Sequence, residues 1–398
     1  MNSWTYVCRL WVLACLSFLF GGVGRAGESA SSATTTTTTN ETKEAKGSKF
    51  RDPEDGWLDG SQFLDQVYGF VPLLMPITEP AVGYGVAGGL IFITRKPPGE
   101  DGRPQRPDMT AVGGLGTQNG TWGVFAGNTT TWLDDRLVTL VGMCYASVNL
   151  DYQGIGGDSF FNRHPEGYNL QPLGGGVEVR YRLGNSPVMA GVRYAMASTQ
   201  VSFEHQAPVE IGQREFESRI GGLTPVLVVD TRDNFFTPSK GMLINAEAEL
   251  YSEALGGDSE FQRIMLTGIY YIPIAKTLTL GLRADTGMSF GRTPFYMRPS
   301  ITLRGVAALS YQGQEMAQLE TELRWQFWKR YSLVGFTGGG VVWNNLERFK
   351  SDRTVLTGGV GLRYEIARKY GLHMGIDVAF GPSDPALYVQ FGSAWFRP

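Results

Sequence analysis

One short glycine motif has the spacing of a cofactor-binding loop. Residues 83–88 (GYGVAG) match the GxGxxG pattern of dinucleotide-binding loops. Such a loop needs a strand before it and a helix after it, whereas this one lies inside an alternating segment that continues to Ile93. The glycines are therefore interpreted as places where a strand bends or packs closely.

Histidine is the commonest metal ligand and general base, and this chain has very little of it. The three histidines are His164, His205 and His373, and no HExxH pattern occurs. We predict no metal site, no cofactor and no enzymatic activity. A Ser–His pair formed across neighbouring strands, as a lipid-hydrolysing barrel would use, stays open as an alternative.

Charged side chains instead recur at alternate positions of apolar segments. In residues 317–327, Glu320 and Glu322 share one face, and Leu323 and Trp325 share the other. The same period of two occurs in residues 278–286 and 372–380. A period of two over about ten residues is typical of a β-strand with one polar and one apolar face.

The elements that position these side chains are therefore strands. We count sixteen, and fourteen or eighteen stay open. They cover residues 67–77, 81–94, 108–119, 121–133, 136–149, 171–183, 187–204, 217–230, 242–253, 261–272, 277–287, 315–328, 331–343, 355–366, 370–380 and 386–396.

Composition distinguishes a membrane barrel from a soluble sandwich. Charged residues make up 18% of the chain, 53 of 398 residues are glycine, and the net charge of −3 gives no reason to expect a nucleic-acid partner. Beyond residue 26, no apolar run is long enough for a membrane helix. We predict an all-β protein, a 16-stranded antiparallel transmembrane β-barrel of the outer membrane. Its lumen would be wet and lined by Arg283, Asp285, Glu320, Glu322, Arg324, Arg363 and Asp377.

The N-terminal residues predict targeting to the bacterial outer membrane. Arg9, the apolar residues 10–20 and the small residues around position 26 form a signal peptide pattern over residues 1–26. Residues 27–60 are threonine-rich and then charged, which is typical of a disordered spacer. Residues 61–398 are assigned to the barrel.

Loop lengths give an independent check on the strand order. The long connections, 150–170, 205–216, 288–314 and 344–354, all follow odd-numbered strands. Barrels of this type have long extracellular loops and short periplasmic turns, so this pattern puts both chain ends at the periplasmic side. Residues 95–107 and 231–241 break the pattern.

The second exception carries a recognisable motif. Residues 230–241 (DTRDNFFTPSKG) resemble the DTRDNxxxPSxG signature of the BamA/TamA-type outer-membrane assembly superfamily, where it forms a periplasmic turn. Asp and Asn side chains bond nearby backbone groups, proline sets φ, and glycine allows positive φ. The turn residues implied by the resemblance are Asp230, Arg232, Asp233, Asn234, Pro238 and Gly241.

A second motif lies in the long loop between the eleventh and twelfth strands. Leu303, Arg304 and Gly305 resemble the family's [VL]RG[FY] motif, which implies a loop folded into the lumen with its arginine paired to inward acids. Glu322 matches the family's acidic strand position. Two departures are Val306, where the family has an aromatic residue, and Gly338, where it has a second acid; Glu320 or Asp285 would then complete the site.

The final strands also resemble this family, a bacterial surface antigen barrel. Family members that deliver substrates carry polypeptide-transport-associated domains, and residues 27–66 are too few for one, so we expect a reduced, barrel-only member.

The resemblance implies a weak seam between the first and last strands that assists insertion, assembly or translocation of outer-membrane components. The implied partners are the outer-membrane bilayer, nascent outer-membrane proteins and a periplasmic accessory protein. The alternative is a closed pore or a surface-binding barrel with no assembly activity.

Overall fold

The structure is a computed structural model, and it describes part of the chain. It describes residues 50–395 except 53, 63–68, 95, 97–107, 156–158, 206, 209–210, 345–352 and 383–384. The predicted signal peptide, residues 27–49 of the predicted spacer and the exceptional loop 95–107 lie outside the described residues, apart from Lys96. No helix in the described part is long and apolar enough to cross a membrane.

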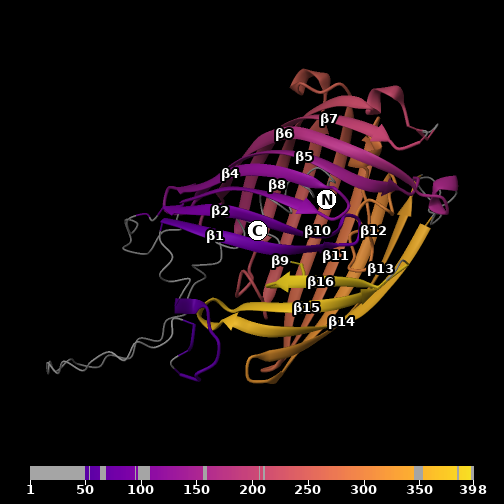
Figure 1. The fold of residues 1–398 in the computed structure, drawn as a ribbon. Coiled ribbons are helices and arrows are strands. Elements are labelled where there is room, and N and C mark those ends of the chain that lie inside the picture. Colours follow the sequence, from indigo (N-terminus) through magenta and orange to yellow (C-terminus); the bar gives the residue numbers. More distant parts are fainter. Residues whose placement is uncertain are drawn as a thin grey trace, which may run out of the picture.

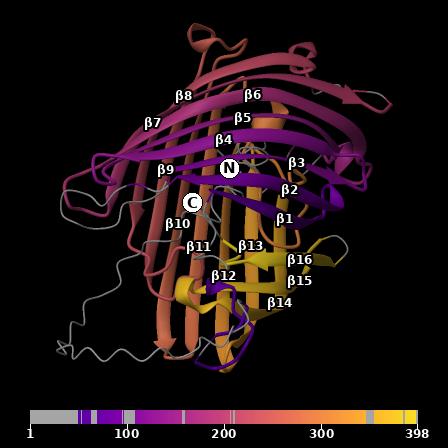
Figure 2. The same cartoon turned by 60° about the vertical axis from the view of Figure 1, so that its left-hand side comes forward.

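Sixteen strands form one antiparallel sheet whose spatial order follows the chain order (Figure 1). The strands are β1 Gly69–Glu79, β2 Gly83–Thr94, β3 Asp108–Thr117, β4 Trp122–Trp132, β5 Leu137–Tyr152, β6 Glu166–Arg182, β7 Val188–Phe203, β8 Glu217–Asp230, β9 Gly241–Tyr251, β10 Phe261–Ala275, β11 Leu278–Gly291, β12 Glu315–Trp328, β13 Tyr331–Trp343, β14 Arg353–Ala367, β15 Leu372–Phe380 and β16 Ala386–Phe391. The sheet curls round so that β1 lies beside β16 in both views (Figures 1 and 2). The predicted fold class and strand count are confirmed.

Most strand boundaries follow the predicted segments, and three agree at both ends: β8, β12 and β13. Two differ by five residues. β6 begins at Glu166 instead of residue 171, because its first residues pair with the end of β5. β16 ends at Phe391 instead of residue 396, because Gly392 has a φ of +76° and turns the chain inward.

The alternation in the sequence separates the outside of the barrel from the inside. On β12, Leu319 is 59% exposed and Leu323 is 43% exposed, whereas Glu320 is 1% exposed and Glu322 is 6% exposed. The outward apolar face is the face that lipid requires.

The lumen differs in one respect from the predicted wet, polar interior. Among the described residues, Glu79 is the one charged side chain at an inward position of β1 to β5. The other inward positions there are apolar, small or hydroxylated, and many pack into one cluster with the β11–β12 loop. Members of that cluster include Ile77, Ala87, Ile91, Met109, Phe125, Val148, Leu150, Phe295, Tyr296, Met297 and Leu309. This wall is apolar because the loop covers it and excludes water.

Candidate functional site

The barrel is not closed by a backbone ladder between β1 and β16. Each other neighbouring pair of strands has a register of paired residues, interrupted in places by bulges or gaps, but none joins these two within the described part of the chain. A hydrogen bond joins the two strands: the Val389 N–H donates to Thr78 Oγ1 at 3.2 Å. A seam held this way leaves strand-edge groups available.

Two prolines of β1 lie on the edge that faces this seam. In an antiparallel sheet, the N–H and C=O groups of one residue both point to the same neighbouring strand, and those of the next residue both point to the strand on the other side. The Gln118 N–H donates to the Tyr84 carbonyl, so even-numbered residues of β2 face β3. Their partners on β1, which include Pro72, Pro76 and Thr78, must then face away from β2 and toward β16. Proline has no N–H, so two donors are missing from the seam edge.

The loop between β11 and β12 contacts both seam strands from inside the barrel. The Gly305 N–H donates to the Tyr388 hydroxyl on β16 at 2.9 Å. The Ala308 N–H donates to the Glu79 carboxylate at the end of β1 at 3.3 Å. Gly305 has a φ of +89°, and a Cβ there would lie 3.2 Å from the Phe380 backbone, so the close approach needs glycine.

Arg304 sits at the centre of this contact and is buried. Its guanidinium pairs with Glu320 at 2.8 Å and with Glu322 at 2.8 Å, both on β12. It also pairs with Asp377 on β15 at 2.9 Å and lies 3.5 Å from the ring centre of Phe336 on β13. The loop therefore connects three strands through one side chain.

The structure brings together the loop residues and the partner residues that the sequence singled out. Leu303 and Val306 are buried in a cluster with Ile301 and Met316. The acid missing at Gly338 is supplied from β15 by Asp377, which also pairs with Arg363. The sequence predicts that Asp377 faces inward but does not connect it to Arg304. The signal that could have pointed to it is that Asp377 is the one acidic residue on the inward face of residues 372–380.

The turn between β8 and β9, residues 231–240, is held by its own polar side chains. Arg232 makes two hydrogen bonds to the Asp230 carboxylate, at 2.9 and 2.8 Å. Asp233 Oδ1 accepts from the Ser239 and Lys240 N–H groups. Gly241 ends the turn with a φ of +96°.

The same turn reaches across the barrel mouth to the C-terminal strands. Asn234 accepts from two N–H groups of the turn and donates to the Tyr370 carbonyl at 2.9 Å. The Ser393 N–H donates to the Phe236 carbonyl at 2.7 Å. Arg324, from β12, donates to the Pro238 carbonyl at 2.7 Å.

Residues 392–395, which follow β16, fold into the lumen. Trp395 is buried against Leu243, Ile269 and Tyr271, and its indole N–H donates to Glu320. Glu320 therefore contacts both Arg304 and the chain's C-terminal region. The sequence treated residues 392–396 as the end of a strand and did not foresee this inward turn.

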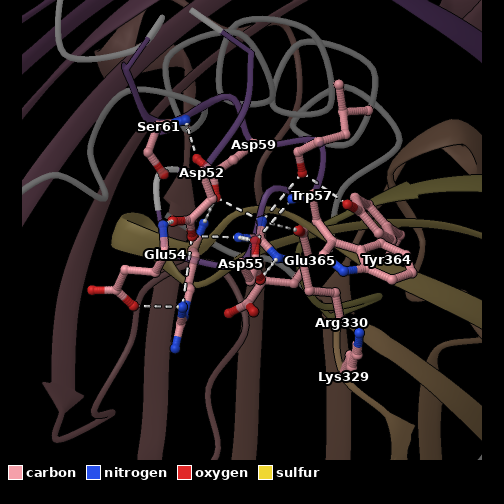
Figure 3. Close-up of polar contacts among 12 residues, drawn as sticks. Asp52, Glu54, Asp55, Trp57, Asp59, Ser61, Lys329, Arg330, Tyr364 and Glu365 are labelled. Atoms are coloured by element: carbon pink, nitrogen blue, oxygen red, sulfur yellow. Dashed lines mark hydrogen bonds and ion pairs between the residues drawn. The ribbon is translucent and has the colours of Figure 1, made fainter. Parts of the chain in front are cut away.

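A third contact with the C-terminal strands comes from the N-terminal segment, residues 50–62. Figure 3 shows Arg330, in the β12–β13 turn, surrounded by acids of this segment. Its guanidinium pairs with Asp52 at 2.5 Å, Asp55 at 2.8 Å and Asp59 at 2.7 Å. The predicted spacer thus includes residues that pack against the barrel.

The electrostatics of this segment favour the charged forms. The hydrogen bond from Arg330 is the largest cause that holds the pKa of Asp55 below its usual value. Burial would raise the pKa of Asp59, but hydrogen bonds from Ser61 and Arg330 outweigh it and keep that pKa low. Trp57 adds edge contacts to Trp328 and Tyr331, with ring centres 5.2 and 6.0 Å apart.

The described residues offer little catalytic chemistry. Residues 287–291 (GMSFG) fit the GxSxG pattern, but they lie in strand β11 and Ser289 Oγ donates to the Gln314 carbonyl, so this is no strand-to-helix elbow. No group of three or more His, Cys, Asp or Glu in the described part could hold a metal ion.

The fold and the seam define the class: an outer-membrane β-barrel of sixteen strands. Residues 146–384, more than half of the chain, match the Omp85 superfamily domain. The chain belongs to the Omp85 superfamily, which agrees with the resemblance seen in its motifs.

Solved structures show the same fold at low identity. BamA from Haemophilus ducreyi lacking POTRA domains 1–3 is 11% identical, with a TM-score of 0.55 over 86% of this chain and 79% of that one. CdiB from Escherichia coli is also 11% identical, with a TM-score of 0.55 over 81% of this chain and 61% of that one. CdiB from Acinetobacter baumannii is 10% identical, with a TM-score of 0.51 over 83% and 66%. A comparison with curated proteins gave no match.

Proposed function

We propose that this barrel assists the insertion, assembly or translocation of outer-membrane components through the seam between β1 and β16. The observation that carries the proposal is the seam itself: no backbone ladder joins the two strands in the described part of the chain. Family membership and the fold shared with BamA and CdiB support it.

An unpaired strand edge is reactive in a membrane. Lipid offers no partners for N–H and C=O groups, so each unsatisfied group costs several kcal/mol. An edge in that state gains free energy when an incoming strand pairs with it. Pro72 and Pro76 remove donors from the β1 edge, which weakens closure against β16 and keeps the seam open to exchange.

The proposed partners follow from this mechanism. The outer-membrane bilayer surrounds the barrel, nascent outer-membrane proteins would pair with the seam, and a periplasmic accessory protein would deliver them. The signal peptide, residues 1–26, would be cleaved during export to the bacterial outer membrane, and residues 27–49 would act as a spacer. The motifs at Arg304 and at residues 230–241 would both help to position the C-terminal strands that border the seam.

The alternative is a closed pore or a surface-binding barrel. It predicts ion conductance or a bound ligand, and no effect on other barrels. A wide pore needs a water-filled lumen, whereas Phe295, Tyr296 and Met297 of the β11–β12 loop are fully buried there. This burial argues against a wide pore; a surface-binding barrel with a plugged lumen is separated from the assembly function by the seam experiment below.

A disulfide across the seam tests the proposal. Thr78→Cys and Val389→Cys, in a Cys144→Ser background, place two thiols where the Thr78 side chain already contacts the Val389 backbone. In native membranes, we expect oxidation to deplete other outer-membrane barrels and reduction to restore them.

The matched control shares one substitution. Ile376→Cys with Val389→Cys joins β15 to β16, which are already paired at these positions, so its oxidation should change nothing. If the seam disulfide forms fully and other barrels keep their abundance, the assembly function is wrong, and conductance becomes the next measurement.

A further inference from the structure

A cavity of about 300 Å³ lies directly behind the seam. It is bounded by residues of β1, β3, β4 and β5, by residues 300–309 of the β11–β12 loop, and by β16 with Ala394 and Trp395. We call it the seam cavity. An apolar engineered cavity of about 150 Å³ stays dry and binds benzene, so this volume holds a longer hydrocarbon.

The walls of the seam cavity are mostly apolar. Ile77, Leu115, Val148, Leu150 and Leu309 line it, and the first three come from different strands. Polar side chains also line the cavity, among them Thr78, Thr121, Ser300, Thr302 and Gln390, but the five aliphatic side chains offer no hydrogen-bonding partner to water. The occupant that matches this lining is a hydrocarbon.

The charged groups at one end of the seam cavity already pair with each other. Arg304 and Arg283 reach the cavity together with Glu320. Arg304 pairs with Glu320 at 2.8 Å, and Arg283 pairs with Asp285 at 2.7 Å. Glu79 also lines the cavity, and its carboxylate accepts from the Ala308 N–H. The charged groups of the lining therefore already have partners in the protein, so the cavity does not favour a charged headgroup.

The seam cavity reaches the seam between β1 and β16. Pro76 and Thr78 of β1 and Val389 of β16 line it, and these residues flank the seam that no ladder closes in the described part. Leu74, two residues from Pro76, is 73% exposed on the lipid-facing surface. The cavity and the apolar outer surface therefore meet at the same seam residues.

We infer that the seam cavity binds the acyl chain of a phospholipid from the surrounding bilayer, which enters sideways between β1 and β16 and leaves its headgroup outside. The inference goes beyond the proposed function, since it needs the geometry of the seam but no assembly activity. A bound chain fills space behind strands that must separate if the seam opens.

The test uses the full-length protein alone in vesicles, so it does not depend on other barrels. The vesicles contain equal parts of phosphatidylethanolamine and phosphatidylglycerol, with a trace of phosphatidylethanolamine that carries a diazirine at the end of one acyl chain. After irradiation, we expect adducts of intact phospholipid mass on Val148 and Leu150, and also on the outward residue Met143. Labelling of Met143 without labelling of Val148, Leu150 or Trp395 would overturn the inference.

A second arm distinguishes the source of the hydrocarbon. In this arm, the vesicles contain a free fatty acid that carries the same diazirine in place of the labelled phospholipid. Adducts on Val148 from the fatty acid, with none from the phospholipid, would show that the ligand is not a bilayer lipid.

Oxidation of the seam pair Thr78→Cys and Val389→Cys before lipid is added should abolish the Val148 adducts and leave those of Met143. Adducts that persist would show that the chain does not enter through the seam.

Filling the seam cavity gives an independent check with a matched control. Ala146→Leu adds volume at a lining residue, and Ala197→Leu makes the same change in the same apolar cluster but away from the cavity. We expect loss of the Val148 adducts in the first variant alone; equal loss in both would contradict the inference. If Ala146→Leu does not fold, Leu115→Phe fills the same cavity from β3.

Discussion

The inner wall of β1 to β5 and the inner wall of β11 to β15 differ in their charge, although their outer faces are alike. The first wall is held by apolar packing, as around Ile91 and Met109. The second combines paired charges, as around Arg304 and Asp377, with smaller apolar clusters. The alternation of apolar residues on the outer face of the strands therefore does not determine which side chains fill the inside of a barrel.

The seam lies where these two walls meet. β1 belongs to the apolar wall, and β16 follows the charged one. The β11–β12 loop contacts both, through Glu79 on one side and Tyr388 on the other. The two seam strands are thus supported by different interactions, and each support can be removed separately.

Removal of Arg304 should have the largest effect on the charged wall. Arg304→Ala leaves Glu320, Glu322 and Asp377 without their shared cation, and breaking a buried ion pair costs about 3–5 kcal/mol. We expect a loss of about 4 kcal/mol in the free energy of unfolding, measured by urea unfolding in vesicles. Arg219→Ala, at an exposed pair with Asp258, should cost less than about 1 kcal/mol. Equal effects at the two sites would show that the Arg304 cluster does not stabilise the barrel.

Truncation of the apolar wall should cost slightly less. Ile91 is almost fully buried in the cluster, and Ile91→Ala leaves a cavity worth about 3 kcal/mol in the same unfolding experiment. Ile91→Val removes one methylene group and should cost about 1 kcal/mol. If the two substitutions cost the same, side-chain volume does not govern this wall, and the contrast between the walls fails.

Loss of the β8–β9 turn contact should weaken the charged wall at its other end. Asn234→Ala removes two accepted hydrogen bonds and one donated to Tyr370, so we expect a loss of about 1–2 kcal/mol. Asn234→Asp keeps the acceptor and should recover part of that stability. Unfolding midpoints of the three proteins check the order; an Asp variant no better than Ala would mean that the turn is held by other bonds.

The smallest effect concerns the N-terminal segment, which pairs with Arg330 beside the charged wall. The pKa values of Asp55 and Asp59 lie below the usual 3.8, so their stabilising effect is present above that pH and is lost as the pH falls through the lower values. Trp57 fluorescence, in a protein whose other tryptophans are replaced, should stay constant from pH 8 to pH 5 and change below about pH 4. Arg330→Ala should release the segment at all these pH values, whereas Glu54→Gln, at an exposed position, should not. Release between pH 7 and pH 5 would contradict this account of Arg330.

The sequence by itself determined the fold, because the requirement for it is local. A strand that faces lipid needs an apolar side chain at every second position, so the strand segments of the sequence, such as residues 315–328 and 331–343, show a period of two. Turn residues are local in the same way: Asp233 and Asn234 bond backbone groups within a few positions. Family motifs then pointed to Arg304 and Glu322 before any contact was known.

Only the tertiary structure decided what the inward side chains do. A period of two shows that Asp377 faces inward but not that it meets Arg304, 73 residues earlier. The apolar wall of β1 to β5, the inward turn at Gly392 and the pairing of Arg330 with residues 52–59 likewise depend on closure of the sheet. Curling sixteen strands into a barrel brings positions together that no local pattern can relate, and for that physical reason the contents of the lumen and the seam became known only from the folded chain.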